Sequence, residues 1–191
     1  MDAKNEKIFD LYGDLEDLYD EAEENGNSEI METLDTFGLW KAHHKCSGEF
    51  MRKIWNALQG DVDAQRDVGH AFYWSDEHSD EVRAEYKWMD KPHLAVYWFE
   101  RAAKSGDAVA QNYLARLYCP DQEPCGAVKV GRIARHWLEK AAAQKLPVAM
   151  ENLALCLKCG KCPCCNSDIP RAKSLEREAR LLKMRKHKQS N

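Results

Sequence analysis

Apolar side chains recur every three or four residues along most of the chain, which is the spacing of one face of an α-helix. In the middle of the sequence, Ala95, Trp98 and Ala102 follow this spacing. Two further apolar series near the N-terminus predict one helix that stops at Asn25–Gly26 and a second that ends before Ser47–Gly48. The series are Ile8, Leu11, Leu15, Leu18 and Ala22, and then Ile30, Leu34, Phe37 and Trp40. The pattern therefore predicts an all-α protein.

The helical pattern is itself repeated. Residues 93–115 superimpose without gaps on residues 132–154, at an offset of 39 residues. This offset places Trp98 on Trp137, and it also aligns the glutamates and alanines that follow. Self-similarity at a fixed period of this length is typical of proteins built from stacked helix pairs.

Each repeat is expected to be a helix, a tight turn and a second helix. Gly106 ends the first helix because glycine takes the left-handed conformation of a C-cap without steric penalty. Asp107 can then accept hydrogen bonds from the first backbone N–H groups of the next helix. In the second copy, Pro147 occupies a first-turn position, where proline is tolerated. Small alanines let the two helices approach closely, while Trp98 and Leu114 fill the space between them.

Weaker copies flank these two repeats. Gly60–Asp61 matches Gly106–Asp107 at an offset of 46, which puts seven extra residues into a polar loop over residues 75–92, with a short helix over 79–88. A terminal capping helix is predicted from Ala172, Leu175, Ala179 and Leu182. The N-terminal helix pair is either a degenerate repeat or an added cap, and we favour the repeat. The expected domains are 1–46, an array over 47–180 and a basic tail over 181–191.

The repeated motif resembles the Sel-one-like repeat family, a relative of the tetratricopeptide repeats. The motif runs from Trp98 through Glu100 to Ala110–Gln111 and Leu114, and it returns from Trp137 to Leu153. The resemblance covers roughly residues 50–180 and departs from the family in the loops at 75–92, 119–130 and 159–168. It implies a right-handed α-α superhelix, a solenoid, that acts as a non-catalytic adaptor for proteins or peptides. Family members of this kind work in regulation, secretion, chaperone systems and bacterial effector or immunity systems.

A stripe of polar side chains lies beside the Ala/Trp face of each repeat. In solenoids of this kind the first helices line a concave groove, so the stripe is a candidate partner-binding surface. Its members are His93, Tyr97 and Arg101, and in the next copy Arg132, His136 and Lys140. The alternative is an ordinary solvated helix face. Large aromatic residues in the long loop, Trp88 among them, either fold back on the array or contact a partner.

Charge is unevenly distributed, although the net charge is only −4. Residues 1–36 contain thirteen acidic residues and two lysines, a charge of −11, whereas residues 171–191 contain eight basic and two acidic residues, a charge of +6. These ends are either two solvated faces or regions that steer a charged partner. Nucleic-acid binding is not expected, because most of the surface is not basic. The sequence has no apolar run near the length of a membrane span and no apolar segment behind a basic start, so a cytoplasmic protein is expected.

Cysteines form the one unusual cluster. Cys156 aligns with Leu117 and is expected to be buried in the core. The loop that follows contains four more, Cys159, Cys162, Cys164 and Cys165, and the spacing of the first two suits tetrahedral thiolate ligation of zinc. Reduced thiols and disulfides are the alternatives to a zinc site, and Cys119 and Cys125 are a further candidate pair.

No catalytic motif is present. The sequence lacks a Gly-rich phosphate loop, a Gly-x-Ser-x-Gly elbow and a His-Glu-x-x-His helix, and the group His43, His44 and Cys46 is best interpreted as a polar helix end. We therefore expect a protein-interaction module without a cofactor. The alternative is a zinc-binding or redox-responsive protein that uses the cysteine loop. An immunity-type inhibitor, with acidic N-terminal helices that shield a basic active site, is a variant of the binding function.

Overall fold

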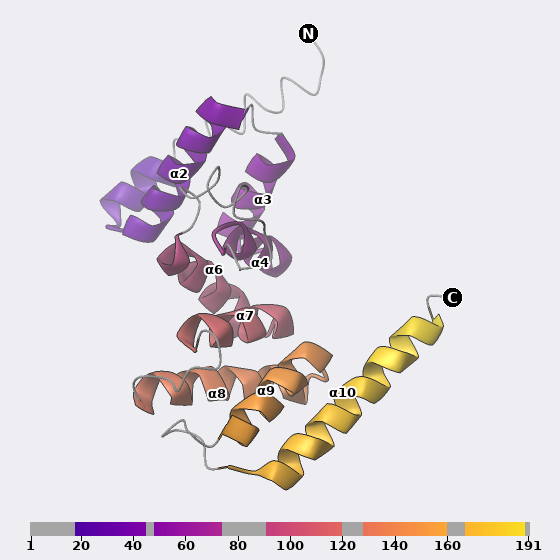
Figure 1. Ribbon diagram of the computed structural model, residues 1–191. Coiled ribbons are helices and arrows are strands. Elements are labelled where there is room, and N and C mark those ends of the chain that lie inside the picture. Colours follow the sequence, from indigo (N-terminus) through magenta and orange to yellow (C-terminus); the bar gives the residue numbers. More distant parts are fainter. Residues whose placement is uncertain (1–17, 45–47, 74–90, 120–127, 160–166, 190–191) are drawn as a thin grey trace. The chain divides into compact units, whose positions relative to one another are not determined.

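A computed structural model describes residues 18–44, 48–73, 91–119, 128–159 and 167–189. Within these ranges every regular element is a helix and there is no strand, so the prediction of an all-α protein is confirmed. The helices follow one another along the chain, and a tight turn joins α3 to α4, α6 to α7 and α8 to α9 (Figure 1). The chain forms two compact units, Met1–Trp98 and Phe99–Asn191.

The first unit has its core between helices that pack their apolar side chains together. Residues 18–24 are helical, and α2 (Ser28–His44), α3 (Gly48–Leu58), α4 (Val62–Ala71) and the first half of α6 (Pro92–Lys104) follow. Ile54, Val68, Leu94 and Trp98 are completely buried. Burial of these large apolar side chains is the main stabilising contribution in this unit.

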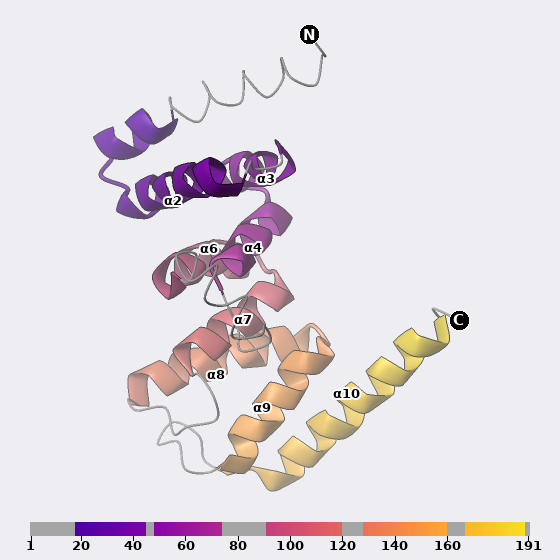
Figure 2. The same ribbon diagram turned by 45° about the horizontal axis from the view of Figure 1, so that its top comes forward.

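The second unit contains the rest of α6 and four further helices. These are α7 (Ala108–Tyr118), α8 (Val128–Ala143), α9 (Pro147–Cys159) and α10 (Ile169–Gln189). Its buried cluster includes Leu138, Met150, Leu153 and Leu157. Helix α10 lies alongside α9 in both views (Figure 2). It packs there through Ala172 and Ala179, whose small side chains are fully buried.

The same turn joins the two helices of each pair. At Gly106 (φ +102°) the backbone N–H donates to the Ala103 carbonyl at 3.1 Å, and the N–H of Asp107 donates to the Ala102 carbonyl at 3.1 Å. These two bonds define a Schellman motif, which satisfies carbonyls at the helix end. Gly60 and Gly26 also have positive φ and make the same pair of bonds with their own helices. The predicted role of Gly106 is confirmed. The interpretation of the N-terminal pair as a degenerate repeat stays a prediction.

The second helix of a pair begins with the predicted side-chain cap. Asp107 accepts a hydrogen bond from the Ala110 N–H at 2.6 Å, and Asp61 accepts one from the Ala64 N–H at 2.8 Å. Helix α9 begins at Pro147, also as predicted. The two halves of the pair are further connected by a buried glutamine, since Gln111 Nε2 donates to the Ala103 carbonyl at 3.1 Å.

Two sequence expectations about the fold are wrong. Cys156 is half-buried rather than a core residue, because the buried face of α9 is formed by Leu153, Ala154 and Leu157. Helix α8 begins at Val128, so the end of the predicted loop 119–130 is helical. The proposed short helix at 79–88 lies outside the described residues.

Candidate functional site

The six residues predicted to line a partner-binding groove lie in different surroundings. His93 Nε2 lies 2.7 Å from Glu32 Oε2, and the Tyr97 hydroxyl accepts a hydrogen bond from Asn27 Nδ2 at 3.5 Å. Lys91 Nζ contacts the other Glu32 oxygen at 2.7 Å, and the hydrogen bonds from Lys91 and His93 lower the pKa of the Glu32 carboxyl. His93 and Tyr97 therefore help to hold the start of α6 against residues 27–32 of the same unit.

The remaining candidates lie in the second unit. Arg101 is half-buried on α6, while Arg132, His136 and Lys140 are exposed along α8. Lys140 Nζ is 4.8 Å from the centre of the Trp137 ring, a distance at which cation–π attraction operates. Trp88, the loop candidate, lies outside the described residues.

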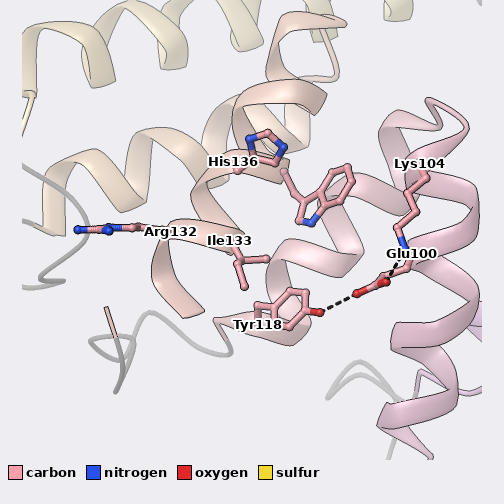
Figure 3. Close-up of a pocket in the computed structure, with 7 residues that line it drawn as sticks. Glu100, Lys104, Tyr118, Arg132, Ile133 and His136 are labelled. Atoms are coloured by element: carbon pink, nitrogen blue, oxygen red, sulfur yellow. Dashed lines mark hydrogen bonds and ion pairs between the residues drawn. The ribbon is translucent and has the colours of Figure 1, made fainter. Parts of the chain in front are cut away.

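A pocket in the second unit brings Arg132 and His136 together with residues of three helices. Its volume is about 660 Å³, and Figure 3 shows it between α6, α7 and α8. The lining residues are Glu100, Lys104, Tyr118, Arg132, Ile133, His136 and Trp137. We call this site the α8 pocket.

On one side of the α8 pocket, the polar side chains form hydrogen bonds with one another. Lys104 Nζ and the Tyr118 hydroxyl each donate a hydrogen bond to the Glu100 carboxylate at 2.8 Å (Figure 3). Partial burial favours a higher pKa for Glu100, but the hydrogen bonds from Lys104 and Tyr118 outweigh it, so that this pKa lies below 4.5. Burial and the neighbouring Glu100 raise the pKa of Tyr118 to about 12. Glu100 is therefore an ionised carboxylate whose charge is already compensated inside the pocket.

The other side of the pocket is apolar with a cationic edge. Trp137 and Ile133 are half-buried, and the Trp137 ring meets the His136 ring edge-on at a centroid distance of 5.3 Å. Arg132 extends away from the Glu100–Tyr118 pair (Figure 3). Arg132 therefore lies at the rim of the pocket, and its guanidinium points outward.

Trp98 and Trp137, which the repeat places at equivalent positions, have different surroundings. Trp98 is fully buried, and its indole Nε1 donates to the Thr33 hydroxyl at 3.0 Å. Trp137 is only half-buried and borders the α8 pocket. The repeat pattern predicts a core position for both tryptophans, so it does not indicate Trp137 as a site residue. The missed pair Glu100 and Lys104 had a sequence signal, because oppositely charged residues four apart meet on a helix surface.

The cysteine loop is mostly outside the described residues. Of the four candidate zinc ligands only Cys159 is described, and it is a free thiol, as is Cys156. The described part of the chain contains no group of three or more His, Cys, Asp or Glu residues able to hold a metal ion. Cys119 is disulfide-bonded. The pairing with Cys125 and the zinc site both stay predictions.

None of the described helices combines the length and the apolar character needed to cross a bilayer. Helix α2 ends at His44, and Cys46 lies outside the described residues.

Comparison with known proteins gives two matches. The Sel1 repeat family matches residues 87–107 and 108–146. The chain is also similar in structure to a protective antigen present in uropathogenic Escherichia coli strains, which displays an SLR fold, with a TM-score of 0.56 and 25% sequence identity. That match covers 85% of this chain and 32% of the antigen, so this chain spans about a third of the antigen's length. No curated protein matches the sequence.

These matches agree with the helix pairs and Schellman turns described above. Sel1 repeats generally mediate protein–protein interactions, and the fold is typically a non-enzymatic scaffold. The predicted class, an all-α solenoid of helix pairs, is thereby confirmed. Residues 87–146 of the chain contain Sel1 repeats, and the all-α fold around them is similar to the SLR fold of the antigen.

Proposed function

We propose that this chain binds a protein partner without catalysing a reaction, and that the α8 pocket receives an apolar side chain from an acidic segment of that partner. The observation that carries the proposal is the half-buried Trp137, whose repeat equivalent Trp98 is completely buried. A tryptophan left partly open beside a cavity of about 660 Å³ offers the surface that interfaces most often use as an anchor.

The apolar part of the pocket supports an aliphatic or aromatic anchor. Trp137 and Ile133 are both half-buried and share the lining with Tyr118. Full burial of a leucine-sized or phenylalanine-sized side chain contributes about 1.5–3 kcal/mol to binding before ordering costs are subtracted.

The charge at the pocket supports an acidic partner. The one acidic residue of the lining, Glu100, already accepts hydrogen bonds from Lys104 and Tyr118. Arg132 is exposed at the rim, and Lys140 lies over the Trp137 ring. A carboxylate beside the anchor would meet the Arg132 guanidinium in a charge-assisted hydrogen bond, whereas a basic segment would be repelled.

Site-specific crosslinking followed by mass spectrometry tests this proposal. A photoreactive amino acid at Ile133, which faces the pocket, should capture one partner, and the crosslinked peptide should contain Asp or Glu next to an apolar residue. Arg132→Glu should reduce this crosslink at least about tenfold, because it replaces an attraction by a repulsion at the rim. Arg52→Glu makes the same charge change on an exposed position of α3 and should leave the crosslink unchanged.

A second variant removes the anchor surface itself. Trp137→Ala should abolish the crosslink while circular dichroism still reports a helical protein. Crosslinks that are equally strong in wild type, Arg132→Glu and Trp137→Ala would refute the pocket as the binding site.

The identity of the captured partner distinguishes an adaptor or regulator from an immunity-type inhibitor. An adaptor or regulator would bind without changing an enzymatic activity, whereas an immunity-type inhibitor would bind one enzyme and block its activity in a direct assay. Either role fits the proposed chemistry, because both need only a surface complementary to the partner.

We also propose a cytoplasmic location, and the oxidation state of Cys119 is its critical test, since disulfides persist mainly in oxidising compartments. Alkylation of the thiols in intact cells, followed by cell fractionation, tests the location. Recovery of the reduced chain in the cytoplasmic fraction supports it, and recovery of the oxidised chain in a periplasmic or secreted fraction refutes it.

A further inference from the structure

Helix α10 has an outer face that no described element covers. The helix packs on the core through Ala172 and Ala179, with Leu175 and Leu182 beside them. The opposite face is a row of exposed residues spaced four, four, three and four apart, which places them on one side of the helix. This row, the outer stripe, consists of Lys173, Arg177, Leu181, Met184 and Lys188.

The centre of the outer stripe is apolar. Leu181 is 49% exposed and Met184 is 54% exposed, the two highest values among the large exposed hydrophobic residues described. They lie one turn apart, with Arg177 before them and Lys188 after them. An apolar pair inside a cationic rim is the arrangement of a docking surface rather than of an ordinary solvated face.

The positive charge of α10 is not compensated on the outer stripe. The two acidic residues of the helix, Glu176 and Glu178, pair with Lys158 and Lys145 from the preceding elements. Lys183 pairs with Glu151. In contrast, no ion pair joins the cations of the outer stripe to any described residue.

The complementary charge is present elsewhere in the same chain. Residues 18–36 contain seven acidic residues and no lysine or arginine. Five of them are exposed, and we call these the acidic patch: Asp20, Glu21, Glu23, Glu24 and Asp35. The pKa of Tyr19 is raised above 10.0, mainly by the charge of Asp35 and further by desolvation and the charge of Glu23. This shift reflects the negative potential at the acidic patch.

The acidic patch also has an apolar component. Tyr19 is half-buried beside Asp35, and Met31, also half-buried, lies one helical turn before Asp35 on α2. These side chains would give Leu181 and Met184 an apolar surface to contact inside a ring of opposite charges.

We propose that the outer stripe of one copy of this chain docks on the acidic patch of a second copy. The association is heterologous, because the two surfaces differ and each copy has both, so that copies add head to tail. No residue of the α8 pocket takes part, and the proposal is therefore independent of the proposed function.

A second copy is the occupant that the charges favour. A nucleic acid or an anionic membrane would also attract the stripe, but the net charge of −4 opposes the approach of either polyanion. The acidic patch, in contrast, supplies the complement in the same molecule and at the same concentration.

Sedimentation velocity of the full chain over a range of concentrations tests the proposal. At low salt the weight-average sedimentation coefficient should rise with concentration, with a dissociation constant on the order of 10–100 µM, as for a small interface. Raising the salt from about 50 to about 500 mM should weaken the association roughly tenfold, because exposed charges are screened.

Matched charge reversals make the test specific. Arg177→Glu on the stripe and Glu24→Lys on the patch should each weaken self-association about fivefold or more. An equimolar mixture of these two variants should associate again, because one variant keeps the normal stripe and the other the normal patch. Arg52→Glu, an exposed reversal on α3, is the control and should associate like the wild type. Leu181→Ser with Met184→Ser should also weaken association without a change in net charge.

Three results would overturn the proposal. The first is a sedimentation coefficient that does not depend on protein concentration, even if its value changes with salt. The second is an association that Arg177→Glu leaves intact or that the mixture fails to restore. The third is binding of phosphatidylglycerol vesicles or of a short duplex RNA by α10 in a chain that stays monomeric. Circular dichroism of each variant should match the wild type, since all the substituted residues of the stripe are exposed.

Discussion

The indole nitrogen of Trp98 donates a hydrogen bond to the Thr33 hydroxyl at 3.0 Å, and both side chains are completely buried. The Thr33 hydroxyl in turn donates to the Glu29 carbonyl at 2.7 Å. This chain of bonds satisfies the only polar atom of the Trp98 side chain and connects α6 to α2 within the first unit. A buried donor without a partner would cost free energy of folding, so Thr33 is part of the reason that Trp98 can be fully buried.

Replacing Thr33 by valine should therefore lower the free energy of unfolding by about 1–3 kcal/mol, because the indole N–H loses its acceptor in the core. Urea denaturation monitored by tryptophan fluorescence measures this loss. Thr36→Val is a matched control, since Thr36 is also buried and donates to the Glu32 carbonyl at 2.7 Å. Equal losses in the two variants would show that the bond to Trp98 has no special role.

The turn after α8 has a lysine where the other turns have glycine. Lys145 has a φ of +61°, whereas Gly106 has +102° and Gly60 has +95°. The left-handed conformation costs a residue with a Cβ atom about 1 kcal/mol or more. Lys145→Gly should therefore be more stable than Lys145→Ala by about 1 kcal/mol, as measured by urea denaturation.

Both Lys145 variants lose the exposed ion pair with Glu178, so their comparison isolates the backbone conformation. Gly106→Ala gives the reverse test, since no heavy atom beyond its own chain neighbours lies within 4 Å of the added Cβ and only the φ is unfavourable. If Gly106→Ala is as stable as the wild type, the left-handed turn does not control stability.

Asp107 and Asp61 should each contribute to stability as helix caps. Asp107→Ala should lower the free energy of unfolding by about 1 kcal/mol, because the Ala110 N–H loses its acceptor. Asp107→Asn keeps a side-chain oxygen at the same position and should retain most of the stability. Thermal unfolding followed by circular dichroism distinguishes these outcomes, and equal losses for Ala and Asn would contradict a capping role.

The Glu100–Tyr118 hydrogen bond should make stability depend on pH at both ends of the scale. The pKa of Glu100 is lowered from 4.5, so the stability it contributes is present above pH 4.5 and is lost as the pH falls through the folded-state pKa. The pKa of Tyr118 is raised from 10.0 to about 12, so its contribution is present below pH 10 and is lost as the pH rises toward 12.

Urea midpoints measured across these two pH ranges, for the wild type and for Tyr118→Phe, test this dependence. The variant should lose less stability in both ranges, because it cannot donate to Glu100 and has no phenol to ionise. Parallel curves for the two proteins would show that the bond does not contribute.

The cysteine loop gives a prediction about metal content. Adjacent thiols such as Cys164 and Cys165 are awkward ligands for a single ion. We expect elemental analysis of the purified protein to find zinc well below one equivalent per chain. A stoichiometric zinc content that disappears in Cys159→Ser with Cys162→Ser would instead establish the zinc-binding alternative.

Features that depend on neighbours in sequence were predictable. The helical faces follow from three-four spacing, the turns from Gly106 and Gly60, and the caps from Asp107 and Asp61. These features are local because a Schellman turn or an N-cap involves residues within a few positions of one another. The repeat extended this local information along the chain and indicated the family before any coordinates.

Burial was less predictable, because it depends on which elements meet in space. Cys156 and Leu117 align as the repeat requires, but both lie beside the buried face of their helices rather than on it. His93 and Tyr97 fit the polar stripe of the sequence pattern, yet they contact Glu32 and Asn27, which are far away in the sequence.

The sequence by itself determined an all-α chain of Sel1-like helix pairs, with the positions of its turns and caps, since periodicity and capping chemistry act over a few residues. Only the tertiary structure decided that Trp98 is buried and hydrogen-bonded to Thr33. It also decided that Trp137 borders a pocket with Glu100 and Tyr118. The physical reason is that equivalent residues of two repeats have the same local surroundings, but their exposure is set by side chains that other helices supply. The candidate site arises at Trp137 because the space around this position is only partly filled, whereas the space around Trp98 is filled completely.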